Sequence, residues 1–258
     1  MKPIKRTYGW KRQLPDYRDV PYSLWRLVTT LPATVDLVKD VELPTFDQGT
    51  LGSCTANAIS MALYFEQLKQ KTKETFLPSR LFIYYNERAM EGTIKQDAGA
   101  VIRDGFKTVA QLGACPEDQW KYDISKFRNK PTKTCYKHAM DHQALVYGAV
   151  PQNLIAIQDC LAAGYPFVFG FSVYESFQSR EVARTGIMPM PKRNESLLGG
   201  HAVMAVGYDN KTKMVKVKNS WGDRWGDNGH FYMPYAFITN LGMASDFWKV
   251  TLVEGEVT

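Results

Sequence analysis

Gln48-Gly49-Thr50-Leu51-Gly52-Ser53-Cys54-Thr55 is the stretch that decides the fold of this chain. Cys54 opens the run 55–66, whose small and apolar residues predict a largely buried helix with Ser53 available as its N-cap. A thiol at this position feels the positive end of the helix dipole, which favours the thiolate. Gln48 adds a side-chain amide of the kind that an oxyanion hole needs. The stretch therefore predicts a nucleophilic cysteine, with a buried, inert cysteine as the alternative.

A second informative region lies far downstream. Residues 199–208 read Gly-Gly-His-Ala-Val-Met-Ala-Val-Gly-Tyr, which predicts a buried strand, and residues 214–218 alternate as a half-buried strand. A hairpin made of these two strands would bring His201 beside Asn219. A histidine next to a thiol supplies a base, and an asparagine carboxamide orients the imidazole without adding charge.

Three sequence blocks occur in one order: Gln-Gly-x-x-Gly-Ser-Cys at 48–54, Gly-His-Ala-Val-x-x-Val-Gly-Tyr at 200–208 and Lys-Asn-Ser-Trp-Gly at 218–222. Together they resemble the papain-like cysteine proteases over residues 32–248. The resemblance implies an α+β, two-lobed papain-like fold. One lobe would be helical, the other an antiparallel β-barrel-like lobe, with the active-site cleft between them.

The same resemblance assigns roles to individual residues. It implies that Cys54 is the nucleophile, His201 the base and Asn219 the residue that orients it. Gln48 and the Cys54 backbone N–H would form the oxyanion hole. Trp221 would shield the hydrogen bond between histidine and asparagine from water.

Substrate-binding candidates also follow from the resemblance. Gly99 and Ala100 would expose backbone that pairs with an extended substrate, although the stretch also reads as an ordinary loop. Asp246 would form the floor of the pocket that takes the substrate side chain two residues before the cleaved peptide bond. An acidic residue at that place accepts arginine. The alternative is an aspartate that caps local backbone. Gly200 and Ala202 would leave that pocket roomy.

The cysteines and one other substitution point to a particular branch of the family. Leu51 stands where the extracellular and lysosomal members place a disulfide cysteine, and Thr55 replaces their usual tryptophan. Cys115 could pair with Cys135, but free thiols are the default expectation. These departures resemble a disulfide-poor bacterial and viral branch of the family.

The segment 1–30 differs in character from the rest of the chain. It carries seven lysines and arginines against two aspartates, so most of the net charge of +6 belongs to it, and we expect no nucleic-acid partner. Its five tyrosines and tryptophans predict packing rather than disorder. We interpret it as a pro-segment or cleft-covering extension, with a surface-wrapping extension as the alternative. The peptidase domain would span 31–258, with a helical lobe at roughly 50–150 and a β lobe at roughly 165–250 that takes up an exchanged N-terminal strand.

Metal-ligand spacing occurs once, in Cys135-x-x-His138-x-x-x-His142. A structural zinc site usually has four ligands, and no fourth stands out in the sequence. We therefore predict histidines on a helix surface, no metal and no cofactor.

These patterns together predict a cysteine peptidase that acts on peptides or proteins. Endopeptidase action is the default, because no occluding loop with a histidine pair is recognisable, and self-processing near residue 30 is expected. An acyltransferase or deamidase with the same triad, and a silent binding module whose cleft the N-terminal segment fills, stay open. We expect a monomer without a membrane span, since no apolar run approaches 20 residues. A cytoplasmic or non-classically exported protein is favoured, because the start of the chain lacks a secretory signal pattern.

Overall fold

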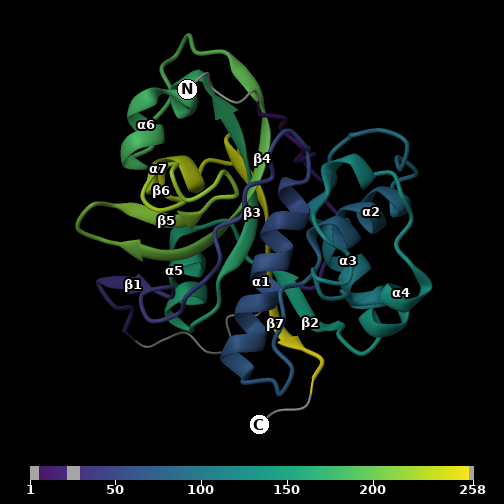
Figure 1. The fold of residues 1–258 in the computed structure, drawn as a ribbon. Coiled ribbons are helices and arrows are strands. Elements are labelled where there is room, and N and C mark those ends of the chain that lie inside the picture. The colour runs from purple at the N-terminus through teal and green to yellow at the C-terminus, as the bar shows by residue number, and fades with distance from the viewer. Residues whose placement is uncertain (1–5, 22–29, 256–258) are drawn as a thin grey trace.

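The longest helix of the fold begins at the cysteine that the sequence singles out. In the computed structural model, which describes residues 6–21 and 30–255, α1 spans Cys54–Gln70 and is buried on nearly all sides. Figure 1 shows it between the sheet and helices α2 to α4. Ser53 occupies the N-cap position, but its hydroxyl lies 2.5 Å from the Tyr122 hydroxyl and makes no cap bond. The predicted helix is confirmed, whereas capping by the Ser53 side chain is wrong because Tyr122 takes the hydroxyl.

The other helices lie on two sides of the molecule (Figure 1). One group packs beside α1, and the second group lies on the side of the sheet. Gly113, with φ of 70°, follows the end of α3. The first group comprises α2 (Arg80–Met90), α3 (Ile102–Leu112), η1 (Ile124–Lys126) and α4 (Lys133–Ala139), and the second comprises α5 (Leu154–Ala162), η2 (Glu175–Gln178), α6 (Arg180–Thr185) and α7 (Tyr235–Ile238).

Seven strands form one antiparallel sheet with the order β2-β7-β3-β4-β5-β6, and β1 pairs with β4 off this path. Among the described residues β2 and β6 end the path without pairing with each other, so the sheet is open and the expected barrel-like closure is wrong. The strands are β1 (Thr34–Asp36), β2 (Ala144–Ala149), β3 (Phe167–Tyr174), β4 (Leu197–Asp209), β5 (Met214–Lys218), β6 (His230–Pro234) and β7 (Ala244–Val253).

The border between helical and β parts differs from the expected one. Residues 144–149 fall inside the stretch that was expected to be helical, yet they form β2 and pair with the last strand, β7. Residues 34–36 form β1 on β4, as an N-terminal strand exchanged into the β part should. Two apolar cores result, one around α1 and Phe106 and the other around Phe169, Phe171 and Phe231.

The hairpin of β4 and β5 positions the residues that matter most. Met204 pairs with Lys218 in its register, and residues 210–213 form the turn. β4 is buried along most of its length, because β3 covers one edge and β5 the other. The predicted pair of strands is therefore confirmed.

The four cysteines, Cys54, Cys115, Cys135 and Cys160, are buried free thiols. Cys115 and Cys135 share one small apolar cluster with Phe82, without a disulfide between them. Among the described helices, none combines the length and the apolar character that crossing a membrane requires.

Candidate active site

Cys54 is the first residue of α1 and lies against β4. Its side chain is fully buried, and burial raises the pKa of the thiol to about 11. Backbone hydrogen bonds at Ala202, Gly9 and Thr55 act in the opposite direction and lower it. The expectation of a thiolate favoured by the helix end is therefore wrong for this covered state, because loss of solvent outweighs the helix dipole.

His201 and Asn219 meet as the hairpin predicts. Nε2 of the imidazole lies 2.8 Å from Oδ1 of the carboxamide; His201 lies on β4, and Asn219 directly follows β5. Nδ1 has no hydrogen-bond partner among the described residues, and burial lowers the pKa of the imidazole to about 4. Trp221 stacks on the imidazole with ring centres 5.0 Å apart and an interplanar angle of 26°, and so covers one face of the ring.

Gln48 lies beneath the same site and is fully buried. The Ser220 hydroxyl donates to Oε1 of Gln48 at 2.7 Å, which fixes the orientation of the amide. Nε2 donates to the Leu51 carbonyl at 2.9 Å and reaches the Thr7 carbonyl at 3.4 Å. The predicted amide is thus aimed at a carbonyl oxygen of the N-terminal segment.

That segment crosses the site as an added strand. Gly9 accepts from the Ala100 N–H at 2.8 Å, and the Lys11 N–H donates to the Ala100 carbonyl at 3.0 Å, in a parallel pairing. On the other side, the Trp10 N–H donates to the Gly200 carbonyl at 3.0 Å. Backbone pairing at 99–100 thus occurs through Ala100. Gly99, with φ of 67°, instead permits close approach, because a Cβ there would lie 1.9 Å from the Gly9 oxygen.

The Trp10 indole fills the space that the sequence assigns to a substrate side chain. A Cβ on Gly170 would lie 1.9 Å from the indole, and one on Gly200 would lie 2.5 Å from it, so both glycines are needed for this fit. Nε1 donates to Oδ2 of Asp246 at 2.9 Å, and the Gln13 N–H reaches the same oxygen at 2.9 Å. Among the described residues, Asp246 therefore accepts from the backbone of the distant N-terminal segment and from the Trp10 indole, and not from its own local backbone as the alternative role required.

Arg6 and Tyr8 are contacts that sequence reasoning missed. Arg6 pairs with Asp47 at 2.5 Å and lies over the Trp221 ring at 5.4 Å. Tyr8 packs edge-on to His201, with ring centres 6.4 Å apart. The aromatic composition of segment 1–30 was the signal that could have pointed to Tyr8, whereas no pattern in the sequence marked Arg6.

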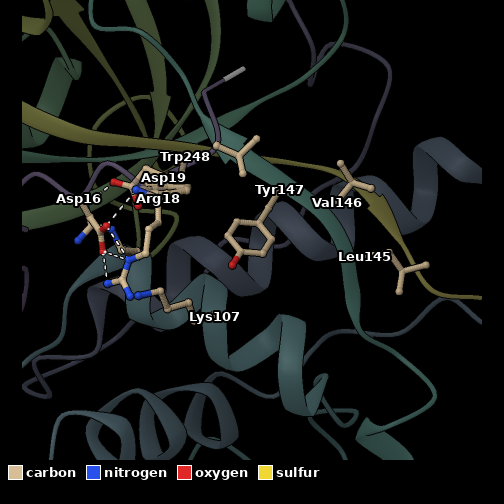
Figure 2. A pocket seen from close by; sticks show the side chains of 10 residues that line it. Asp16, Arg18, Asp19, Lys107, Leu145, Val146, Tyr147 and Trp248 are labelled. Atoms are coloured by element: carbon tan, nitrogen blue, oxygen red, sulfur yellow. Dashed lines mark hydrogen bonds and ion pairs between the residues drawn. The ribbon is translucent and has the colours of Figure 1, made fainter. Parts of the chain in front are cut away.

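Further along, the segment contacts the helical part. Arg103 forms an ion pair with Asp19 and donates to the Leu14 carbonyl at 2.8 Å. The Ala149 N–H donates to the Val20 carbonyl at 2.9 Å. A pocket of about 490 Å³ lies beside these contacts, with the charged side chains on one side and those of β2 facing them (Figure 2).

Glu87 is a third residue near the site that the sequence did not reveal. It is fully buried on α2 and accepts from the Thr55 hydroxyl at 2.8 Å, directly behind Cys54. Burial raises the pKa of its carboxyl well above the usual range. The Thr55 hydroxyl thus gives this buried carboxyl a hydrogen-bond donor.

Comparisons with known proteins agree with this geometry. The model of the papain family of cysteine proteases matches residues 31–250. An uncharacterised peptidase C1-like protein of Acanthamoeba polyphaga mimivirus is 44% identical over 96% of this chain and 87% of its own length. The crystal structure of xylellain, a cysteine protease from Xylella fastidiosa, is 40% identical, covers 100% of this chain and 99% of its own, and superposes with a TM-score of 0.88.

A procathepsin B from Trypanosoma congolense shares the fold, with a TM-score of 0.75 at 18% identity over 95% of this chain and 86% of its own. The family model alone spans most of the chain, and its match includes all three sequence blocks around the buried thiol, imidazole and carboxamide. The chain belongs to the papain family of cysteine proteases.

Proposed function

We propose that this cysteine peptidase is an endopeptidase made as a zymogen, with Cys54 as nucleophile, His201 as base and Asn219 as the residue that orients it. The thiolate attacks the peptide carbonyl carbon, and the imidazolium gives its proton to the leaving amine. Water then hydrolyses the thioester, with His201 taking the proton from the water. The 2.8 Å bond between His201 and Asn219 supports these roles.

Gln48 is the proposed side-chain donor to the oxyanion. Its amide is held by Ser220 and directed toward the Thr7 carbonyl, which is the kind of acceptor that a substrate would present. Loss of one such donor typically lowers the rate by about 10²–10³. Gln48→Ala should therefore lower kcat by that amount in the uncovered enzyme.

One observation carries the zymogen proposal: residues 6–13 pair with Ala100 and Gly200 on both sides of a fully buried Cys54. Burial beneath this segment favours a neutral thiol and a neutral imidazole. Attack requires the thiolate, so the covered pair does not cut the segment in place. Activation then requires the segment to leave the site before it is removed.

The pocket that holds Trp10 is the proposed subsite for the side chain two residues before the cut. Gly170 and Gly200 leave room for a large group, and Asp246 offers an acceptor at its floor. We infer that the uncovered enzyme accepts arginine or lysine there beside apolar residues. The substrate class of the enzyme is then peptides with large apolar or basic side chains at that position.

Mass spectrometry of the full chain over time, beside Cys54→Ala, tests the proposal. We expect the wild type alone to lose a fragment ending near residue 30, which adjoins the undescribed residues 22–29, while cleavage of a dipeptidyl fluorogenic substrate rises in step. A stable chain that still cleaves the substrate would overturn the zymogen part. A stable, inactive chain whose Cys54 does not react with an epoxide inhibitor would favour the silent binding module. The observation that supports this second candidate is that the N-terminal segment fills the site.

A further inference from the structure

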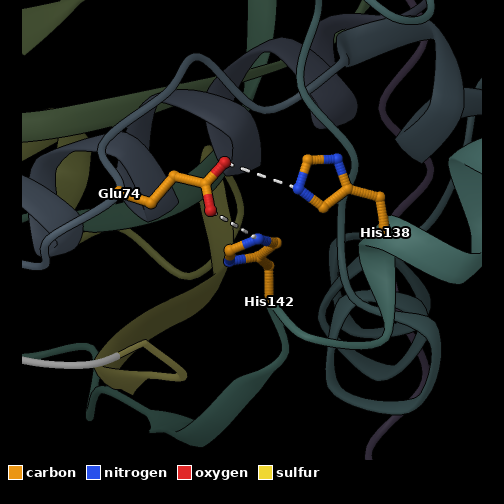
Figure 3. A group of neighbouring side chains, drawn as sticks. All are labelled: Glu74, His138 and His142. Atoms are coloured by element: carbon orange, nitrogen blue, oxygen red, sulfur yellow. Dashed lines mark ion pairs between the residues drawn. The ribbon is translucent and has the colours of Figure 1, made fainter.

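Two histidines and a glutamate converge on the helical part, at the far end of α1 from Cys54. Nε2 of His138 lies 3.5 Å from one carboxylate oxygen of Glu74, and Nε2 of His142 lies 3.7 Å from the other. Figure 3 shows both rings turned toward this one carboxylate. The potential ligand atoms all lie within 4.8 Å of one another. In a tetrahedral zinc site with bonds of about 2.0–2.1 Å, neighbouring ligand atoms are about 3.3 Å apart, so little adjustment is needed.

We propose that Glu74, His138 and His142 bind a zinc ion, or a similar divalent transition metal, with water in the fourth position. Two imidazoles and one carboxylate are a ligand set that such ions take with an open coordination position. The ion would join the connection between α1 and α2 to the end of α4.

This site differs from the one that the sequence spacing suggests. Cys135 does not take part, because its thiol is buried and contacts the Thr132 hydroxyl at 3.1 Å and the Gln119 carbonyl at 3.8 Å. Glu74 takes its place from a segment far upstream in the sequence. The prediction of no metal rested on the lack of a fourth protein ligand; here Glu74 replaces Cys135, so three side chains would bind the ion and water would complete the site.

The backbone that carries the two histidines is held in place. A Cβ on Gly113 would lie 1.6 Å from the Ala139 carbonyl oxygen, and the Ala114 N–H donates to the His142 carbonyl at 3.2 Å. The end of α4 and the loop after it therefore lie directly against the end of α3. A site that is organised before binding loses less entropy when the ion enters.

The individual rings are also oriented. Nε2 of the Gln119 amide lies 2.6 Å from Nδ1 of His138, so the amide donates to Nδ1 and the proton of the neutral ring lies on Nε2. Metal binding through Nε2 requires the amide to turn over, so that its oxygen accepts from the Nδ1–H and fixes the other tautomer. The Phe76 ring packs edge-on to His142 with centres 4.6 Å apart.

The local charge also suits a cation. The carboxylates of Glu74, Asp141 and Glu254 lie near enough to the His142 ring to act on its charge, and they attract a cation. The Glu74 side chain is 60% exposed, so it can rotate to complete the site.

Zinc titration of metal-free full-length Cys54→Ala protein tests the site, because that background removes the active-site thiol as a competing ligand. Calorimetry should give one ion per chain with a dissociation constant in the micromolar range or tighter, and Co²⁺ should give the visible absorption of a tetrahedral site. Zinc at a hundredfold excess over its dissociation constant should raise Tm by roughly 5–10 °C.

Glu74→Gln and His142→Gln should each weaken zinc binding by about tenfold or more. Mutation of a residue that only hydrogen-bonds to a metal ligand already costs about tenfold in affinity, so loss of the ligand itself should cost at least as much. Asp141→Asn removes a neighbouring exposed charge but no ligand, and should change affinity by less than about threefold. Glu74 is exposed, so its variant is expected to fold, and circular dichroism checks this. The proposal would be overturned if zinc did not bind, if it bound only at millimolar concentrations, or if both ligand variants left one-to-one binding unchanged.

Discussion

The indole Nε1 of Trp10 donates a 2.9 Å hydrogen bond to Oδ2 of Asp246. The N-terminal segment therefore binds the carboxylate of the candidate specificity pocket. Asp246 is buried and adopts φ of 63°. Burial raises the pKa of its carboxyl, while the hydrogen bonds from Gln13, Ser245 and Trp10 lower it. When the segment leaves, two donors leave with it, and the carboxylate becomes available to a basic substrate side chain.

Asp246→Asn should change specificity rather than general activity. Asparagine tolerates the positive φ and keeps an acceptor oxygen, but it cannot form a charged pair with arginine. In the processed enzyme we expect kcat/KM for an Arg-Arg substrate to fall roughly 10–100-fold, the worth of a hydrogen bond to a charged group. Hydrolysis of a Phe-Arg substrate serves as the control and should stay near its original rate. An unchanged ratio between the two substrates would show that Asp246 does not read this position.

Trp10→Ala should loosen the cover of the active site. The indole packs over Gly170 and Gly200, and burial of a large apolar side chain contributes about 1.5–3 kcal/mol. Labelling of Cys54 in the intact chain by a peptide epoxide should therefore become about 10–100-fold faster, scored by mass on the full-length species alone. Tyr17→Ala is the matched control, because this aromatic residue of the same segment is 96% exposed. Equal labelling rates for the two variants would contradict a role for Trp10 in closure.

Much of the site could be predicted from the sequence because its residues lie in regular local structure. Cys54 begins a helix marked by its small and apolar residues, and one hairpin brings His201 and Asn219 together. Each of these relations depends on short-range geometry. Local patterns therefore determined them.

What the sequence did not reveal depends on contacts between distant segments. Glu87 lies 32 positions from Thr55 and becomes visible only when α2 packs on α1. The open sheet likewise depends on β2 pairing with the last strand, β7, which no local pattern indicates. The state of the thiol was misjudged for the same reason, because its burial comes partly from residues 6–13.

Acid should open the covered site. Burial lowers the pKa of His201 to about 4, and the nearby Arg6 charge also lowers it. The covered state therefore gains stability from the neutral imidazole above pH 6.5, the usual histidine value, and loses this contribution as pH falls toward 4, by up to about 3 kcal/mol.

Hydrogen exchange of the Trp10 and Lys11 amides in Cys54→Ala protein measures this opening. Between pH 7 and pH 4.5, after correction for intrinsic exchange rates, protection should fall roughly 50–100-fold. Adding His201→Gln should remove most of the pH dependence, because glutamine does not titrate. A fall of the same size in that double variant would assign the effect to other groups.

Glu87→Gln should stabilise the protein increasingly as pH rises. Burial raises the pKa of Glu87 well above its usual range, with the Glu91 and Asp104 carboxylates adding to the effect and the Thr55 hydroxyl and Arg88 opposing it. A carboxyl whose folded-state pKa is raised contributes its full stability below its unfolded pKa and loses it as pH rises through the folded value. Glutamine keeps the shape and the acceptor for Thr55 but does not ionise.

Urea unfolding of Cys54→Ala protein at pH 5, 6.5 and 8 should therefore show a free-energy difference between Glu87→Gln and its parent that is small at pH 5 and grows toward pH 8. Glu181→Gln on α6 is the control, since that carboxylate is 69% exposed and its variant should follow the parent at every pH. Thr55→Val should lower stability by roughly 1–3 kcal/mol, because it removes the donor to Oε2 while Oε1 has no partner among the described residues. A difference between Glu87→Gln and its parent that stays constant with pH would mean that Glu87 ionises in the folded protein as an ordinary carboxyl does.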